Sequence, residues 1–366
     1  MRNYIFRRLL LLIPIMLLVT FMTAATFRII PGNAAHLICG INAGQICIDD
    51  VEREYGLDEN FPRQYGEWLG IVPDDDRGSE WSWSNPADYA GGYVREFMRP
   101  YAELFGIGDD GESNQFHGVM QGEFGVSYIN TGEKVTSRLE RTLPITMQLM
   151  VLSLFFSVAI GIPAGVLSAI RPGTPLDWVV RLASVAWLSV PNFYLAILVI
   201  VFGSSWFGWL PPNFATGKAA LIWDDPVTSM ETFFFPSLVL SLSISAVIMR
   251  LTRSSMLEVM RNDYVRTAWS KGLKERAVVW RHALKNAMIP VLTIIGLQVG
   301  GLIGGSVLIE SVFALNGMGN YLLVSVIARD LLVVQSLVLI FAVVFVVVNL
   351  VVDISYAWLD PRIRYG

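Results

Sequence analysis

The sequence predicts an all-α integral membrane protein with six transmembrane helices and an enlarged segment outside the membrane after the first helix. Two observations predict this fold class. Of the 366 residues, 54% are hydrophobic and only 16% are charged, whereas soluble domains carry roughly 25% charged residues. The hydrophobic residues are also concentrated in six uncharged runs, each at least 18 residues long. A helix needs about 20 apolar residues to cross the ~30 Å hydrocarbon layer.

The uncharged runs give the order of the helices along the chain. In lipid a helix satisfies all of its own backbone hydrogen bonds, so runs of this length favour helices. The third run exceeds one crossing, and its end, from about Trp206 through Pro212, is expected outside the bilayer. Pro144, Pro163 and Pro191 are expected to interrupt their helices. The runs are Leu9 to Phe27, Thr142 to Ile170, Leu182 to Gly217, Thr232 to Met249, Asn286 to Ile309 and Leu331 to Val352.

The orientation follows from charge, because lysine and arginine are retained on the cytoplasmic side of a membrane. The segment Arg250 to Lys285 holds nine basic and three acidic residues, a net charge of +6. The segment Ile30 to Glu140 holds seven basic and twenty acidic residues, a net charge of −13. We therefore expect the basic segment inside a cell (plasma or inner) membrane, the acidic segment outside it, and both termini in the cytoplasm. The first run has a cleaved secretory signal as its alternative interpretation.

The acidic outer segment contains both cysteines of the chain, Cys39 and Cys47. Oxidising conditions outside the cell let disulfides persist, so we expect a bridge between them, with two free thiols as the alternative. A metal site is not expected, because no histidine pattern completes a set of four ligands.

The same segment divides into two parts. Asp49 to Trp68 is expected to be helical, with a break marked by Asp58 and Pro62. From about Gly70 to Gly118 the sequence is rich in loop residues and aromatic residues. A packed cap on the outer surface is the simplest interpretation, and docking of a partner protein or stacking on a sugar-like solute are the alternatives.

Glycine is dense in the fifth predicted helix. Glycines four residues apart let helix backbones approach closely, which predicts tight packing against a neighbour. A pore-lining or moving helix would need the same smooth surface, and the sequence leaves both readings open. Glu310 ends this helix on the outer side and is expected to reach interfacial water. The glycines are Gly296, Gly300, Gly301, Gly304 and Gly305.

The loop between the fourth and fifth helices carries the most specific pattern. Tyr264 to Ser270 can form a short helix with Val265, Ala268 and Trp269 on one side, and Gly272 can end it with a positive φ. Such a helix can lie across the membrane and occupy a partner's groove; a loop that touches anionic lipid is the alternative. The residues expected to form this contact are Tyr264, Val265, Arg266, Thr267, Ala268, Trp269, Lys271, Gly272 and Leu273.

These residues, together with Arg281-His282-Ala283-Leu284-Lys285-Asn286, resemble the cytoplasmic coupling loop of binding-protein-dependent ABC importers. The resemblance is to permeases of the dipeptide, oligopeptide and nickel family. The broader superfamily has Glu-Ala-Ala at the start of this motif, whereas this chain has Arg266-Thr267-Ala268, which weakens any claim about an acidic contact. Further similar stretches are residues 121–127, 253–259, 281–290, 296–301, 310–313, 317–319 and 360–365.

The resemblance implies a type I ABC importer permease fold and a set of partners. Those partners are a second homologous permease subunit, two ABC ATPase subunits that use ATP and Mg, an extracytoplasmic solute-binding protein and the lipid bilayer. Coupling to the ATPases would run through residues 262–285. The implied organisation is a transmembrane helix at 1–30, an extracytoplasmic segment at 31–140 with a family-atypical insertion at about 70–118, a transmembrane domain at 141–360 with its coupling loop at 250–287, and a tail at 361–366.

No catalytic or nucleotide-binding pattern accompanies these features. Gly217-Lys218 is followed by Ala219 and lacks the upstream glycine of a phosphate-binding loop. No pairing of a nucleophile with a base is apparent, so the chain is expected neither to be an enzyme nor to bind a cofactor. Its charge pattern gives no reason to expect nucleic acid. Among solutes, di- and oligopeptides are favoured, and nickel complexes and oligosaccharides stay open. A self-sufficient secondary transporter or channel, and a membrane-embedded enzyme, are the alternative functions.

Overall fold

The computed structural model describes residues 2–29, 34–39, 44–54, 57–72, 118–127 and 133–359. Helices dominate this part of the chain, where the β pairing is one isolated bridge between Val126 and Lys134. The predicted all-α fold is therefore confirmed. Most of the predicted insertion at about 70–118 and the tail at 361–366 lie outside the described residues.

The chain divides into two compact units. The larger unit comprises Met1–Ile13, Arg141–Tyr321 and Phe341–Gly366. The smaller unit comprises Pro14–Glu140 and Leu322–Ile340.

Five helices of the described residues are long and apolar enough to cross a membrane, and a bent pair of helices would supply a sixth span. The prediction of six crossings agrees with this pattern when the bent pair counts as one span. The five helices are α1 (Arg2–Ile29), α6 (Val135–Ile170), α10 (Pro226–Val259), α13 (Leu284–Val312) and α15 (Leu331–Leu359).

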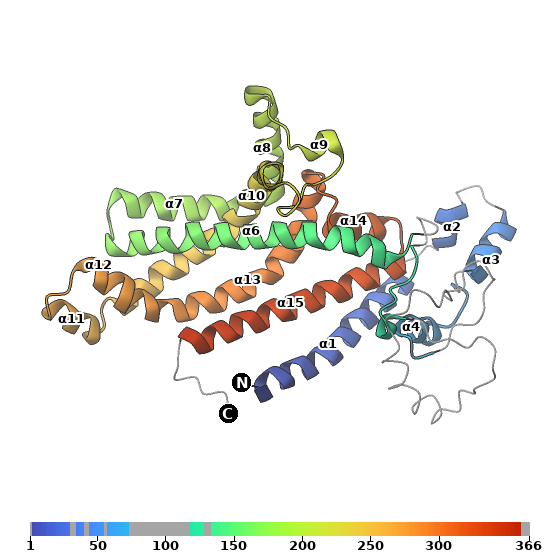
Figure 1. Ribbon diagram of the computed structural model, residues 1–366, viewed down its shortest axis with the longest axis horizontal. Coiled ribbons are helices and arrows are strands. Elements are labelled where there is room, and N and C mark those ends of the chain that lie inside the picture. Colours follow the sequence, from blue (N-terminus) through green and yellow to red (C-terminus); the bar gives the residue numbers. More distant parts are fainter. Residues whose placement is uncertain are drawn as a thin grey trace. The chain divides into compact units, whose positions relative to one another are not determined.

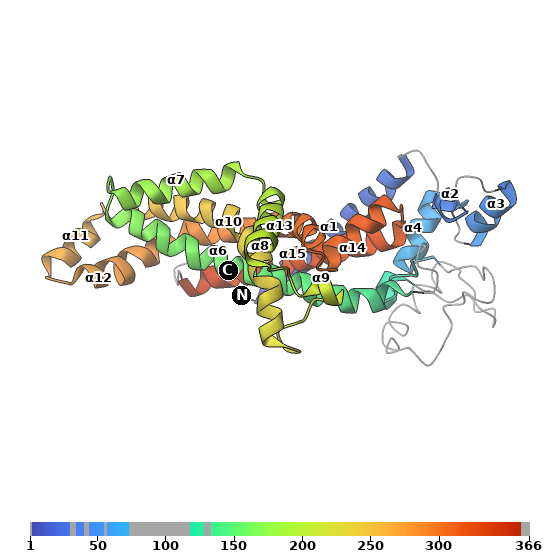
Figure 2. The same ribbon diagram turned by 90° about the horizontal axis from the view of Figure 1, so that it is seen from above.

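The third predicted span differs from the expected single run. It consists of α7 (Pro175–Ser189) and α8 (Asn192–Phe207), whose axes differ by 99°. The break lies at Pro191, whose extended backbone caps the start of α8. Proline lacks the N–H that would continue the preceding helix, so the predicted interruption at Pro191 is confirmed. The bend separates α7 from α8 in both views (Figures 1 and 2).

The predicted interruptions at Pro144 and Pro163 are wrong, because α6 continues through both residues. Each proline removes one backbone donor, and packing by neighbouring helices can hold a transmembrane helix together at such a point. Here α10 lies very close to α6. A Cβ built at Gly161 would lie 2.7 Å from Ile248, and one at Gly165 would lie 2.7 Å from the backbone of α10.

The core of the larger unit lies around α10 and α13, and α7 packs along the other side of α10. Side chains that are fully buried there include Phe233 and Leu240 from α10 and Leu302 and Ile309 from α13. Burying a large apolar side chain contributes about 1.5–3 kcal/mol in water, whereas inside a bilayer close packing takes over that role. The contact between α10 and α13 therefore depends on close packing as well as on apolar character.

Close approach along α13 is uneven. A Cβ at Gly305 would lie 2.8 Å from Leu240, and one at Gly300 would lie 3.1 Å from Phe345. Gly296 is buried. A Cβ at Gly301 or Gly304 would meet nothing within 4 Å. The tight packing expected from the glycines therefore occurs at Gly300 and Gly305, whereas the positions of Gly301 and Gly304 are open among the described residues. The remaining elements of the larger unit are α9 (Asn213–Thr216), α11 (Asp263–Ser270), α12 (Glu275–Ala277), the π-helix η3 (Val278–Ala283) and α14 (Met318–Ile327), which runs into the smaller unit.

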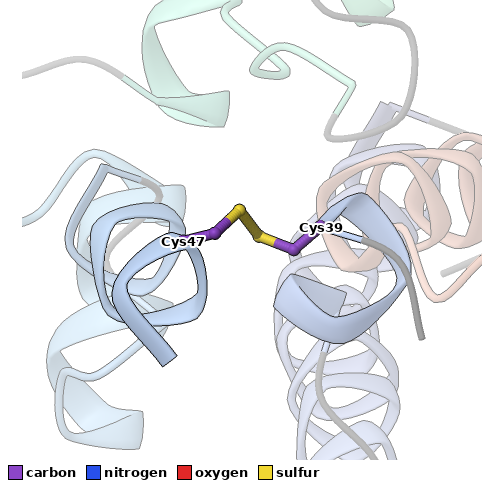
Figure 3. Close-up of a disulfide and its surroundings, with 2 residues drawn as sticks. All are labelled: Cys39 and Cys47. Atoms are coloured by element: carbon purple, nitrogen blue, oxygen red, sulfur yellow. A yellow bond between two sulfur atoms is a disulfide. The ribbon is translucent and has the colours of Figure 1, made fainter. Parts of the chain in front are cut away.

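The smaller unit contains short helices after the first span. Cys39 ends α2 and Cys47 lies in α3, and the two sulfur atoms are bonded at 2.11 Å (Figure 3). Ala35, Ile48 and Val51 form a small apolar cluster beside the bridge. The helix expected over 49–68 is split as its break residues indicated. The elements are α2 (Ala34–Cys39), α3 (Gln45–Glu54), α4 (Phe61–Leu69) and the 3₁₀ turn η2 (Val119–Gln121).

Candidate functional site

The short helix α11 lies in the loop between α10 and α13, at one end of the larger unit (Figures 1 and 2). We call this the basic end, because residues 250–285 carry its positive charge. Val265 and Ala268 of α11 are buried and contact Val278 of η3. The hydroxyl of Tyr264 accepts a hydrogen bond of 2.9 Å from the side chain of Asn286. The helix is therefore attached to the start of α13 on one face.

Gly272 ends the turn after α11. It has φ +74°, and a Cβ at this position would meet no atom within 4 Å. The N–H of Gly272 donates to the carbonyl of Trp269 at 2.9 Å, and the N–H of Leu273 donates to the carbonyl of Ala268 at 3.4 Å. The left-handed backbone expected from the sequence is present, and it closes the helix through these two carbonyls. A side chain here would be strained by the backbone and not by a neighbour.

The rest of the α11 surface is exposed, including the ring of Tyr264, whose hydroxyl contacts Asn286. Tyr264 and Trp269 are 41% and 43% exposed, so Trp269 does not join the buried side with Val265 and Ala268 as the sequence suggested. A turn of α-helix places residue 269 one position beyond the buried pair, which rotates its side chain outward. We call this face the aromatic-basic face. Its members are the exposed residues Tyr264, Arg266, Thr267 and Trp269 of α11, together with Lys271 and Leu273 of the turn that follows the helix.

Apolar contacts continue from α11 into the larger unit. Val259 and Met260, at the end of α10, pack against the α11 cluster and also against a second buried cluster. That second cluster joins Met256 of α10 with residues of η3, α13 and the end of α6; its other members are Val166, Ala169, Val279, Ala283 and Ala287. Direct packing therefore connects α11 to the ends of α6, α10 and α13.

A buried ion pair lies close to the same end. The carboxylate of Asp177, at the start of α7, is 1% exposed. Arg253 of α10 donates from Nε to Oδ1 at 2.8 Å and from Nη2 to Oδ2 at 3.1 Å. The hydroxyl of Ser168 in α6 donates to Oδ1, and the N–H of Gly173 donates to Oδ2 at 2.9 Å. Two parallel N–H···O bonds of this kind fix the orientation of both groups.

A second buried carboxyl group lies at the opposite end of α13. Glu310 is fully buried, which corrects the expectation that it reaches interfacial water. Thr146 of α6 donates to its Oε1 at 2.7 Å, and the N–H of Asn320 in α14 donates to its Oε2 at 3.0 Å. Thr146 in turn accepts from the N–H of Met318 at 2.8 Å. A Cβ at Gly317 would lie 2.6 Å from Oε2.

The sequence did not single out the buried ion pair or the partner of Glu310. Asp177 and Arg253 are 76 positions apart, and Thr146 and Glu310 are 164 positions apart. A weak signal existed for Asp177, because Thr174 precedes it by three residues and caps α7 by accepting its N–H at 3.5 Å. That pattern predicts a helix start, however, and not an ion pair with a distant helix.

The chain matches two family models. Residues 161–365 match the model described as the binding-protein-dependent transport system inner membrane component, and residues 1–86 match its N-terminal model. The dipeptide transport system permease protein DppB of Alkalihalophilus pseudofirmus is 32% identical to this chain, with 100% of each chain covered. The glutathione transport system permease protein GsiC of Salmonella choleraesuis is 34% identical, again with 100% of each chain covered.

Among solved structures, the chain is similar to one from the MetNI methionine ABC transporter in an inward-facing conformation. The TM-score is 0.48 and the identity is 16%, over 62% of this chain and 98% of that chain. The family match covers more than half of the sequence, including α11, the buried ion pair and Glu310. The protein therefore belongs to the binding-protein-dependent transport permeases and is a multi-pass membrane subunit of that family of importers.

Proposed function

We propose that this chain forms half of a translocation path for di- or oligopeptides. We further propose that α11 transmits the conformational change of the partner ATPase subunits to this path. The observation that carries the proposal is the two-sided structure of α11. Val265 and Ala268 attach the helix to the ends of α6, α10 and α13 through shared packing, while the aromatic-basic face is open. A short helix with one anchored face and one exposed face suits docking in a groove of a motor subunit.

Membership of the family supports the rest of the assembly. The proposed partners are a second permease subunit, two ATPase subunits and an external solute-binding protein. ATP binding would close the ATPases, move α11, and open the path toward the loaded binding protein. The peptide assignment is supported by relatives named as dipeptide and glutathione transport permeases. Which peptides are transported would depend on the binding protein that delivers them.

The proposed orientation has the basic end in the cytoplasm. It is tested by placing single cysteines at Lys274 and at Asp58, which belong to the segments of net charge +6 and −13. An impermeant maleimide added to intact cells should label Asp58→Cys, and Lys274→Cys should react only in inverted vesicles. Cys39 and Cys47 are bonded to each other and should stay unlabelled without reductant. Labelling of both variants from outside would contradict the proposed topology.

The coupling role of α11 is tested with Gly272→Val. A β-branched residue at φ +74° is disfavoured by roughly 1 kcal/mol or more, which should mis-aim the aromatic-basic face without blocking membrane insertion. The complex is reconstituted in proteoliposomes, with ATP on the side of the membrane where the ATPase subunits lie. Uptake of a defined mixture of di- to pentapeptides is followed by mass spectrometry, and ATP hydrolysis is followed with and without the binding protein. Stimulated hydrolysis and uptake should both fall, while basal hydrolysis persists.

Gly217→Val is the matched control. Gly217 ends α9 with φ +67° and also has no atom within 4 Å of a built Cβ, so the substitution adds the same backbone strain at a position remote from α11. This variant should keep stimulated hydrolysis and uptake. Full activity in Gly272→Val, or an equal loss in both variants, would remove α11 as the site of coupling.

A further inference from the structure

We propose that Asp177 and Arg253 are positioning residues of the transport cycle, and that their ion pair makes α7 follow α10 when α11 is displaced. This inference rests on the proposed function, because it assigns a path to the movement that α11 would receive. It adds a residue pair that touches neither solute nor nucleotide.

Among the residues that the structure describes, the two apolar clusters at the basic end contain no residue of α7. The cluster that contacts α11 and the cluster that follows it contain residues of α6, α10, η3 and α13. In α7 the buried residues are Asp177 and Ser184, both polar, and Ser184 makes its hydrogen bond within α7. Trp178, Leu182 and Val185 of α7 are more than half exposed in this chain, whereas Val180 and Trp187 are partly buried.

The helix α7 nevertheless packs along α10. The described side-chain bonds that connect the two helices are those between Asp177 and Arg253. The same carboxylate also accepts from Ser168 in α6 and from Gly173 in the turn before α7. One buried group therefore joins the end of α6, the start of α7 and the body of α10.

Arg253 is suitably placed to transmit movement. It lies three residues before Met256, which belongs to the buried cluster shared by α6, α10 and α13. After Met256 and Glu258, the chain reaches Val259 and Met260, which contact the α11 cluster. The Arg253 side chain is 24% exposed, and its planar guanidinium donates to both carboxylate oxygens of Asp177. A rotation of α10 would therefore move α7 with it.

The alternative to this proposal is that the ion pair serves only folding. A folding role would lower the yield or the unfolding temperature and leave the coupling of the assembled complex unchanged. A positioning role changes the relation between α7 and α10 during the cycle and the amount of peptide moved per ATP. The test therefore measures assembled complexes only.

The helix relation is measured with spin labels at Val179→Cys in α7 and Ser254→Cys in α10, both exposed positions. The complete complex is placed in nanodiscs, and the distance between labels is recorded without nucleotide and with ATP plus vanadate. With the native pair, one narrow distance is expected in both states. With Asp177→Asn, the distribution should become at least twofold broader or shift in the vanadate-trapped state, because the guanidinium fork loses its charged partner.

The functional readout uses the same complexes in proteoliposomes without labels. Asp177→Asn should retain at least half of the ATP hydrolysis and lower uptake of the di- to pentapeptide mixture at least tenfold. Arg253→Lys keeps the charge but not the two parallel bonds and should be intermediate. The double variant Asp177→Asn/Arg253→Gln should be no worse than the poorer single variant, since both changes break one contact.

Asp225→Asn is the matched control. Asp225 precedes α10, is exposed, and accepts the N–H of Val227 and the N–H and hydroxyl of Thr228. No arginine of the described residues forms an ion pair with it. It should leave label distances and uptake within twofold of the native chain.

The outcomes separate the two proposals. Native distances and uptake in assembled Asp177→Asn, or independent additive losses in the double variant, would overturn the positioning role. If Asp177→Asn does not assemble, Arg253→Lys decides the matter, and unchanged distances and uptake in that variant would be the contrary result. If the native chain never forms a complex that hydrolyses ATP, the proposed function itself fails.

Discussion

The two buried carboxyl groups of the larger unit are stabilised in different ways. Asp177 is held by a guanidinium from another helix, with Ser168 and Gly173 as additional donors. Glu310 is held by a threonine hydroxyl and by backbone N–H groups at the start of α14, and no basic residue of the described chain forms an ion pair with it. Both groups are out of contact with solvent.

The difference follows from what each carboxyl group joins. The start of a helix presents backbone donors with no intrahelical partner, so a carboxyl group there needs no separate cation. Gly317 and Gly319 allow the chain to wrap closely around Glu310, because a Cβ at either position would lie within 3.0 Å of its Oε2. Asp177 also lies at a helix start and accepts one backbone N–H, from Gly173, but its other donors are the side chains of Ser168 and Arg253 from two other helices.

The comparison is tested most strongly by Arg253→Met. This substitution removes the cation that is hydrogen-bonded to the buried Asp177 carboxylate and leaves only the 40% exposed Arg181, at 3.5 Å, in an ion pair with it. Removal of one member of a buried pair typically costs about 3–5 kcal/mol. The free energy of unfolding of the detergent-purified chain, from titration with SDS in mixed micelles, should fall by that amount. A loss below about 1 kcal/mol, the value typical of an exposed pair, would show that water reaches Asp177.

Gly317→Ala tests how tightly the chain encloses Glu310. The new methyl group would lie 2.6 Å from Oε2 and 2.7 Å from the Thr146 hydroxyl, and overpacking of this kind typically costs about 1–3 kcal/mol. Gly301→Ala is the control, because its Cβ would meet nothing within 4 Å and alanine is the better helix former. The same SDS titration compares them. Equal stability of the two variants would contradict the close enclosure.

Thr146→Val tests the hydroxyl that links Glu310 to α14. Valine removes the donor to Oε1 and the acceptor of the Met318 N–H, and leaving such buried groups unpaired costs about 1–3 kcal/mol. We expect this loss to be smaller than that of Arg253→Met, because no charged group is removed. Thr293→Val, at an exposed position on α13, should be nearly neutral. A loss as large as that of Arg253→Met would show that the hydroxyl matters as much as a cation.

Arg181→Ala should have the smallest effect. Arg181 lies 3.5 Å from Oδ1 of Asp177 and 4.2 Å from the centre of the Trp178 ring, but it is 40% exposed. Exposed ion pairs and cation–π contacts contribute about 1 kcal/mol or less. The free energy of unfolding should therefore change by no more than that. A larger loss would assign Asp177 to Arg181 and not to Arg253.

Local features of the sequence predicted much of the fold and of α11. Long uncharged runs predicted the spans, because each run contains its own reason to be in lipid. Gly272 predicted the positive φ at the end of α11, since the constraint acts on one residue. The break at Pro191 was predicted for the same reason, whereas Pro144 and Pro163 were expected to break a helix that α10 holds together by packing.

The sequence by itself determined that the chain is helical, crosses a membrane repeatedly and has a short amphipathic helix in a basic loop. These properties depend on residues that are neighbours along the chain. Only the tertiary structure decided that Arg253 pairs with Asp177, that Thr146 pairs with Glu310 and that Trp269 is exposed. Those outcomes depend on which helices come together and how each is rotated, and a single sequence carries no record of contacts between residues 76 or 164 positions apart.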